Sequence, residues 1–270
     1  MASKTPRTDA RAWWQTSIID MAPGKIEFRG QPIQTIIGEK SFAQMIWFMA
    51  LGSDLSTDEA ALFEAALVAG VDHGPQAPSI AAARMAASCG VGLNNAMASA
   101  VNMLGDVHGG AGEQCAELYY NIHTRIDAGE GLEHAVDAGL AQWRENHGKI
   151  VSGFGHRFHV PTDPRAPRLM HLVRQAAKTG SVRDTFVQIG EAIEQRLSTT
   201  KPIPMNIDGA TAVIFCTLGA PAPLARGFFC LSRSVGILAH VWEQMGEGRR
   251  NKGPMPPEFL PLYIGQSART

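Results

Sequence analysis

The sequence is short of the features that assign many proteins to a class at a glance. It has only four cysteines in 270 residues, and none lies in a CxxC pair or at the spacing of a zinc finger. This argues against a disulfide-stabilised or zinc-ribbon protein. Basic residues are not in excess either, because 24 Lys and Arg stand against 25 Asp and Glu. A surface for nucleic acid needs such an excess, so we expect no nucleic-acid partner.

Long apolar runs are missing as well. The most apolar stretch, residues 211–242, is interrupted by two prolines and two arginines, so no segment reaches the roughly 20 residues that span a bilayer. Residues 1–11 are polar and hold no apolar signal core. We therefore expect a cytoplasmic protein without a membrane partner, in which the cysteines are reduced and buried. The four are Cys89, Cys115, Cys216 and Cys230.

What the sequence does contain is a helical pattern over most of its length. Hydrophobic residues make up 45% of the chain, which is ample for a core, and they recur at intervals of three and four residues. The STDE sequence at residues 56–59 has the form of a capping box that begins a helix. We predict further helices at residues 42–51, 113–128, 132–147, 164–179, 181–197, 208–218 and 224–245, with alanine-rich helical segments at 81–87 and 96–100. Strand signal is confined to residues 25–30, so the predicted fold class is all-α with one short β-hairpin near the N-terminus.

Four polar, glycine-rich junctions between these helices are candidates for a functional site, because binding residues concentrate on loops held by a rigid scaffold. The side chains that stand out in them are His73, His108, His156 and Asp208. A single loop histidine is more typical of a surface or capping residue. Four such junctions in a chain without a metal motif indicate acid–base chemistry. We expect no metal, because His156 and His159 have no cysteine or glutamate partner close by in the sequence.

Five motifs follow one another in an order that resembles the citrate synthase superfamily. They are DHGPQAPS with His73, GDVHGGAGE with His108, GFGHRFHVPTDPRAP with His156, NIDG with Asp208, and SRSVGILAHVWEQ with Arg233. The resemblance covers roughly residues 16–252. Within the superfamily, TSIIDMAPGKIEFRGQPI and DHGP are most similar to the citryl-CoA lyase module of ATP-citrate lyase. The module has an aromatic residue where this chain has His108, and this departure keeps synthase chemistry open.

The resemblance implies a citrate synthase-like fold of two helical domains. A large domain would combine residues 1–108 and 214–270, and a small domain would comprise residues 109–213. Closure of the cleft between them would shield the reaction from water. The chain resembles a stand-alone lyase domain without the extra N-terminal helices of typical citrate synthases. Because the superfamily is built from dimers, we expect at least a homodimer.

The resemblance also assigns three catalytic roles. Asp208 would remove a methyl proton from acetyl-CoA, a very weak carbon acid. His108 would donate a hydrogen bond to the enolate oxygen that develops, and His156 would donate one to the carbonyl of oxaloacetate. The same residues would serve the reaction in the direction of cleavage.

Substrate binding follows from the resemblance in the same way. The dicarboxylate would be bound by His73, Arg165 and Arg233, because arginine forks suit carboxylates. Arg250, or its neighbour Arg249, would reach in from a partner subunit.

Coenzyme A would contact the loop of Gly153, Phe154 and Gly155, where glycine lets a ligand approach the backbone closely. Arg157 and Lys201 would contact its phosphates or its pantetheine arm. Coenzyme A enters as the thioester substrate, and we expect no separate cofactor and no metal.

The leading functional hypothesis is a citryl-CoA lyase, which cleaves citryl-CoA to acetyl-CoA and oxaloacetate. One alternative is a citrate synthase, which forms the same bond and hydrolyses the thioester, and a weaker one is a 2-methylcitrate synthase that uses propionyl-CoA. A non-catalytic sensor of CoA or dicarboxylates would be expected to lack Asp208 or His156, and both are present. A metal-dependent hydrolase on a helical scaffold is the remaining rival, and a strong chelator would identify it.

Overall fold

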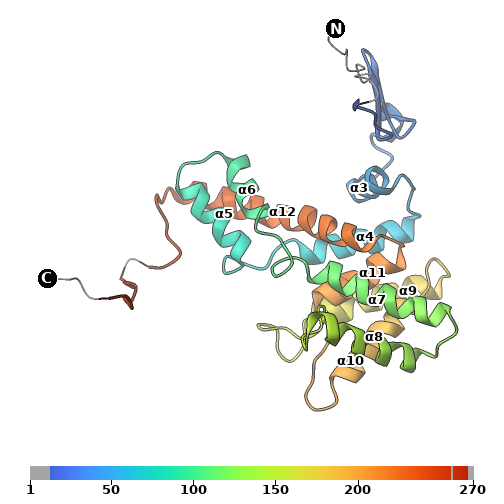
Figure 1. Cartoon of the computed structure of the whole chain (residues 1–270). Helices are drawn as coiled ribbons and strands as arrows, with labels where there is room; N and C mark the ends of the chain where they lie inside the picture. Colours follow the sequence, from blue (N-terminus) through green and yellow to red (C-terminus); the bar gives the residue numbers. More distant parts are fainter. Residues whose placement is uncertain (1–12, 257, 267–270) are drawn as a thin grey trace, which may run out of the picture. The chain divides into compact units, whose positions relative to one another are not determined.

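The computed structural model describes residues 13–256 and 258–266, so residues 1–11, considered above for their polar composition, lie outside the described residues (Figure 1). The described chain is mostly helical and carries one small antiparallel sheet near its N-terminus, which confirms the predicted fold class. Contacts divide it into two compact units, residues 1–64 and 65–270. The division into a large and a small domain at residues 108 and 213 stays a prediction.

The first unit contains the sheet. Its strands are β1 (Ile19–Ala22), β2 (Lys25–Phe28) and β3 (Gln31–Pro32), paired antiparallel in the order β1-β2-β3. The sequence predicted only the central strand, because β1 (IDMA) ends in two consecutive apolar residues that break the alternation and β3 has only two residues. The chain turns between the strands at Gly24 and Gly30, both of which have positive φ.

Two short helices follow the sheet, α2 (Ile33–Ile36) and α3 (Phe42–Leu51). The second was predicted with these bounds, and its end at a left-handed Gly52 is also confirmed. Helix α4 (Thr57–Gly70) begins in this unit and continues into the second. Its predicted capping box is present, because the Ser56 amide donates to the Glu59 carboxylate at 2.8 Å and the Glu59 amide donates to the Ser56 hydroxyl at 3.4 Å.

In the described part of the second unit, the regular elements are helices, and two isolated β-bridges join loop residues. The helices are α5 (Pro78–Ser88), α6 (Leu93–Val101), α7 (Ala111–Asp127), α8 (Leu132–His147), α9 (Arg165–Lys178), α10 (Thr185–Leu197), α11 (Ile207–Thr217) and α12 (Ala222–Glu247). All were indicated by the sequence pattern, and the boundaries differ by a few residues at most. The largest difference is the start of α10, which lies four residues after the predicted start at residue 181.

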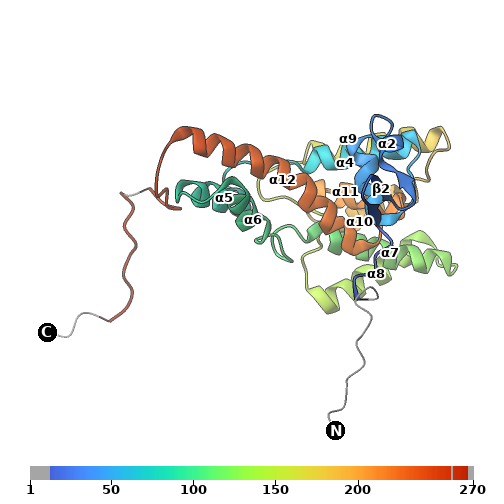
Figure 2. The ribbon, with the colours of Figure 1, turned by 90° about the horizontal axis from the view of Figure 1, so that it is seen from above.

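Helix α11 lies at the centre of this unit. It packs against α7, α9 and α10, and every residue from Gly209 to Cys216 is buried. Helix α12 lies alongside the α5–α6 pair (Figure 2), where small side chains such as Ala83, Ala96 and Ala100 allow close contact. Because Asp208 is on α11 and Arg233 is on α12, this packing fixes the backbone positions of two candidate site residues.

The cysteine prediction is half right. Cys115 and Cys216 are buried, but Cys89 is exposed and Cys230 is only partly buried. Cys89 directly follows the last residue of α5, where the chain leaves the core for the surface. Among the described residues, no helix combines the length and the apolar character that crossing a membrane requires.

Candidate active site

A cavity of about 350 Å³ in the second unit collects the polar residues that the sequence singled out. Its wall is formed by α4, α5, α7, α9, α11, α12 and the loops between them. The predicted residues that line it are His73, His108, His156, Arg165, Asp208 and Arg233. Three catalytic and three substrate-binding candidates from five separate motifs therefore share one cavity.

Asp208 stands in the first turn of α11. The Asn206 side chain caps this helix, accepting from the amides of Asp208 at 2.9 Å and Gly209 at 3.3 Å. Burial raises the pKa of the Asp208 carboxyl, and the positive charges of Arg165 and Arg233 only partly offset this effect. A carboxyl with a raised pKa is suited to exchanging protons with a weak acid.

His108 is held by the N-terminus of α5. The Ser79 amide donates to its Nε2 at 3.3 Å, and the Ser79 hydroxyl lies 2.9 Å from the same atom. An amide can only donate, so Nε2 carries no proton and the neutral ring is protonated at Nδ1. Burial lowers the pKa of His108, and the charge of Arg233 lowers it further. His108 is therefore a neutral imidazole with one N–H to donate.

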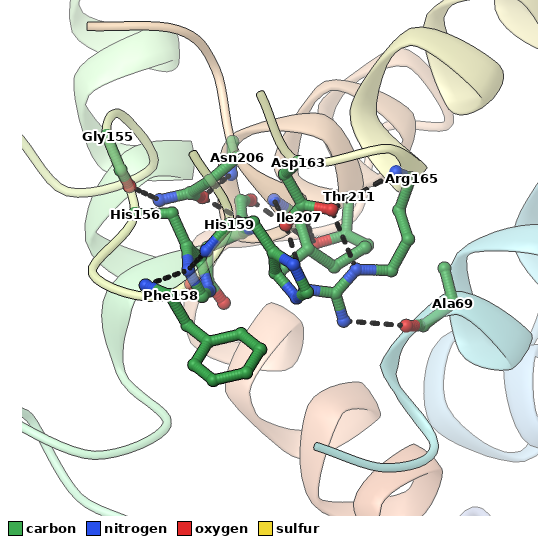
Figure 3. Close-up of polar contacts among 12 residues, drawn as sticks. Ala69, Gly155, His156, Phe158, His159, Asp163, Arg165, Asn206, Ile207 and Thr211 are labelled. Carbon is green, nitrogen blue, oxygen red and sulfur yellow. Dashed lines mark hydrogen bonds and ion pairs between the residues drawn. The ribbon is translucent and has the colours of Figure 1, made fainter. Parts of the chain in front are cut away.

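His156 is held in the opposite tautomer. Its Nδ1 accepts from the amides of Phe158 at 3.0 Å and His159 at 2.9 Å (Figure 3). The proton of the neutral ring must then be on Nε2. Burial, followed by the nearby His159, lowers the pKa of His156. Like His108, this histidine is prepared to donate a hydrogen bond while staying neutral.

Arg233 brings a positive charge into the core. Its side chain is 6% exposed, its Nε donates to the Gly70 carbonyl at 3.1 Å, and its guanidinium stacks over the Phe229 ring at 4.8 Å. Within residues 13–256 and 258–266, no protein group accepts from its two Nη atoms. A buried guanidinium with two free nitrogens at a cavity wall indicates an anionic ligand.

Arg165 is held by Asp163, a residue that sequence reasoning missed although it lies in the DPRAP motif. The Asp163 carboxylate accepts from Nε of Arg165 at 2.9 Å and from Nη2 at 2.8 Å (Figure 3). It also accepts from the Ile207 amide at 3.2 Å. Burial raises the pKa of Asp163, but the hydrogen bonds from Arg165 outweigh this effect and hold the pKa below its ordinary value. One buried carboxylate thus joins the start of α9 to the start of α11.

His73 lies on the loop after α4. Asp72 shapes this loop by accepting from the Gly74 amide at 3.0 Å, and its other oxygen lies 3.2 Å from Nε2 of His240 on α12. Burial and the charges of Arg165 and Arg233 lower the pKa of His73. Sequence reasoning assigned no role to Asp72 or His240, because only the packing of α12 brings them together.

A second cavity, of about 720 Å³, is lined by all five predicted coenzyme A residues. These are Gly153, Phe154, Gly155, Arg157 and Lys201. The two cavities share His156 and Ala111 in their walls. A ligand in the second cavity can therefore reach the histidine that the first cavity also presents.

The loop of residues 153–155 is tied to the start of α11. The Asn206 amide donates to the Gly153 carbonyl at 2.9 Å, and its side-chain amide donates to the Gly155 carbonyl at 2.6 Å. A Cβ on Gly209 would collide with the Gly153 carbonyl oxygen, so glycine is required for this close approach. The contacts join the predicted coenzyme A loop to the helix that carries Asp208.

Arg250 is exposed beyond the end of α12 and lines neither cavity. Its predicted contribution to a partner subunit's site stays a prediction. His159, in contrast, lies beside His73 and His156. The sequence showed that His159 follows His156 closely, but it could not show that the His73 loop folds against both.

A helical scaffold that places one buried carboxyl, two neutral imidazoles and two arginines around a cavity is suited to acid–base chemistry on an anionic ligand. Comparison with known proteins identifies the family. The signature of the citrate synthase C-terminal domain matches residues 39–254. The chain therefore belongs to the citrate synthase family.

Individual relatives agree with this assignment. The citrate synthase of Heyndrickxia coagulans is 31% identical over 222 residues, which are 81% of this chain and 55% of that protein. The structure of citryl-CoA lyase from Hydrogenobacter thermophilus is 31% identical with a TM-score of 0.81, covering 95% of this chain and 96% of that chain. The ATP citrate lyase of Methanosaeta concilii, in complex with (3S)-citryl-CoA, shares the fold at 19% identity and a TM-score of 0.74, covering 98% of this chain and 43% of that chain. The chain spans about half the length of the curated relatives that it matches.

Proposed function

We propose that the protein is a citryl-CoA lyase, which cleaves citryl-CoA to acetyl-CoA and oxaloacetate. The observation that carries this choice within the family is the likeness to the lyase of Hydrogenobacter thermophilus over nearly the full length of both chains. The site geometry supports the chemistry. Asp208 provides the acid–base group, and His108 and His156 provide two neutral hydrogen-bond donors.

Cleavage needs a proton delivered to the carbon of the departing acetyl group. The raised pKa of Asp208 favours the protonated acid that this step requires. His108, protonated at Nδ1, donates to the thioester oxygen as the enolate develops. The hydroxyl of citryl-CoA gives up its proton to solvent as its oxygen becomes the carbonyl of oxaloacetate, and His156, protonated at Nε2, donates a hydrogen bond to that oxygen while it carries negative charge. Asp208, which loses its proton to carbon, regains one from solvent before the next turnover. Two preorganised donors therefore face the two oxygens on which negative charge develops.

Binding divides between the two cavities. The carboxylates of the oxaloacetate part face Arg165, Arg233 and His73 in the first cavity. Coenzyme A lies in the second cavity, where Arg157 and Lys201 provide positive charge for its phosphates. His156 stands where the two meet, next to the bond that breaks. The expectation of a cytoplasmic location stays a prediction.

To test the proposal, the protein is mixed with synthetic citryl-CoA, and the products are followed by chromatography from the first turnovers. Early release of acetyl-CoA and oxaloacetate in equal amounts, with little citrate, is the expected result. Citrate and free coenzyme A as the main early products would overturn the proposal.

The second candidate is a citrate synthase. It is favoured by the names of the curated relatives and by the presence of His108, which completes a synthase-like set with His156 and Asp208. Robust citrate formation from acetyl-CoA and oxaloacetate would support it. The same assay with propionyl-CoA tests the weaker alternative of a 2-methylcitrate synthase.

A further inference from the structure

His159 lies in the site, yet none of the roles assigned above uses its side chain. Its ring centroid is 4.6 Å from that of His156 and 5.6 Å from that of His73, and the latter two are 5.4 Å apart. One ring nitrogen from each residue lies within 4.8 Å of one from each of the others. Three imidazoles from two separate loops thus converge on one point.

Two of these imidazoles make no hydrogen bond to the described part of the protein. In the described part of the chain, the ring nitrogens of His73 and His159 make no hydrogen bond, whereas His156 accepts two amides at Nδ1. His159 lines the second cavity and His73 lines the first. Free ring nitrogens that converge where two cavities meet are available to a ligand.

The charges around the three rings indicate the sign of that ligand. The charged side chains that act on His73 are Arg165 and Arg233, which bring two positive charges, and Asp163, which brings one negative charge. Oxaloacetate brings two negative charges, so the site is short of positive charge once a dicarboxylate is bound. An imidazole that donates an N–H, or takes up a proton, meets this need.

A metal ion fits the cluster less well. Each histidine would have to offer an unprotonated nitrogen, and that of His156 is Nδ1, which already accepts two amides. The positive charges of Arg165 and Arg233 also oppose a cation at this point. The cluster therefore favours an anion over a metal.

We propose that His159 is a third imidazole of the dicarboxylate site, which donates a hydrogen bond from its side chain to a carboxylate of the oxaloacetate part of the substrate. This inference rests on the proposed function and adds a specificity-determining residue to the site. His159 also has a backbone role, because its amide orients His156. The two roles can be separated, since His159→Ala removes the imidazole and keeps the amide.

The experiment titrates oxaloacetate and, separately, coenzyme A into the wild type and variants by calorimetry. His159→Ala is expected to weaken the affinity for oxaloacetate about tenfold to a hundredfold, the effect of losing a hydrogen bond to a charged group. Its affinity for coenzyme A is expected to stay within about twofold of the wild type. His159→Lys is expected to recover much of the oxaloacetate affinity. The matched control is His171→Ala, which replaces an exposed histidine on α9 and is expected to change the affinity for neither ligand.

A second variant adds a readout that a purely structural role would not move. His159→Gln keeps a side-chain N–H donor and is expected to retain more affinity for oxaloacetate than His159→Ala does. An equal loss for both ligands, or a loss of coenzyme A alone, would overturn the inference.

Two further outcomes distinguish a failure of the proposed role of His159 from a failure of the proposed function. If Arg233→Ala weakens oxaloacetate but His159→Ala does not, the inference fails and the proposed function stands. If Arg233→Ala also leaves oxaloacetate unchanged, the proposed site itself is wrong. Oxaloacetate binding that requires added zinc, and is lost with a chelator, would overturn the inference in favour of a metal site.

Discussion

At the scale of single residues, the site depends on which nitrogen of each histidine carries the proton. His108 is fixed by the Ser79 amide, and His156 is fixed by the amides of Phe158 and His159. Backbone amides cannot reverse direction, so these tautomers persist as the substrate changes. Both rings can therefore stabilise a developing negative charge without reorganising.

The ionisation of Asp208 makes the stability of the protein depend on pH. Its pKa is higher in the folded than in the unfolded protein, so the folded state binds more protons between the two values. The free energy of unfolding then falls as pH rises through that range. Asp208→Asn removes the group whose ionisation the folded state disfavours, and is expected to raise the denaturant midpoint at pH 7.

The pH dependence provides the control for this prediction. At about pH 3, below both pKa values, Asp208 is protonated in either state, so wild type and variant are expected to unfold at similar denaturant concentrations. A variant less stable than the wild type at pH 7 would show that the carboxylate stabilises the fold, against this account.

Arg165 and Arg233 are expected to determine the affinity for oxaloacetate. Arg165→Ala and Arg233→Ala each remove a charged partner of a buried carboxylate, which costs about 2–5 kcal/mol in binding. Calorimetry is expected to show this loss for oxaloacetate and a much smaller one for coenzyme A. Arg174→Ala, an exposed arginine on the same helix as Arg165 that pairs with Glu191, is the control and leaves both affinities unchanged. Equal losses for both ligands would point to misfolding instead of a lost carboxylate contact.

At the scale of helices, α12 sets the geometry of the His73 loop. Gly236 of α12 donates its amide to the Val71 carbonyl at 3.1 Å, and a Cβ at this position would collide with the same carbonyl oxygen. One turn further along, His240 reaches Asp72. Helix and loop therefore fit together only because position 236 has no side chain.

A pair of substitutions on this one helix tests the fit. Gly236→Ala is expected to destabilise the protein by about 1–3 kcal/mol, as overpacking does, and to weaken oxaloacetate by displacing His73. Gly227→Ala is the matched control, since a Cβ there meets nothing within 4 Å. It is expected to stabilise the helix by about 0.5–1 kcal/mol. Denaturant unfolding and calorimetry measure both effects, and equal behaviour of the two variants would contradict the packing argument.

The helices show how far sequence reasoning reaches. The 3.6-residue pattern and the capping box at Ser56 predicted most helices, because both signals are local. Motif order placed Asp208, His156 and Arg233 in one cavity through the family resemblance. Contacts between segments distant in sequence were beyond reach. The amide of Ser79 on His108 and the His73 loop beside His159 exist only once the chain is packed.

At the scale of the whole molecule, we expect at least a homodimer. Helix α12 carries an exposed apolar stripe at helical spacing, which is the kind of surface that marks an association site. Its members are Leu231, Val235, Leu238, Trp242 and Met245. A second copy of the chain is the occupant that the family resemblance implies.

Charge placed on this stripe tests the assembly. Trp242→Asp is expected to convert the dimer to a monomer in light scattering, because it buries an unpaired charge in the interface. Ile37→Asp is the control, since Ile37 is similarly exposed, at 70% against 69%, but follows α2 in the first unit and is not a member of the stripe. A wild type that is monomeric at all concentrations would contradict the expectation.

The proposed function requires that Asp208 deliver a proton to carbon as citryl-CoA is cleaved. The most direct measurement runs the cleavage in ²H₂O, removes oxaloacetate by enzymatic reduction to prevent the reverse reaction, and weighs the acetyl-CoA by mass spectrometry. The expected product is acetyl-CoA with one deuterium in its methyl group, and the expected rate for Asp208→Asn is lower by about 10²–10⁴. Citrate and free coenzyme A without deuterated acetyl-CoA, or cleavage by Asp208→Asn within about threefold of the wild type, would contradict it.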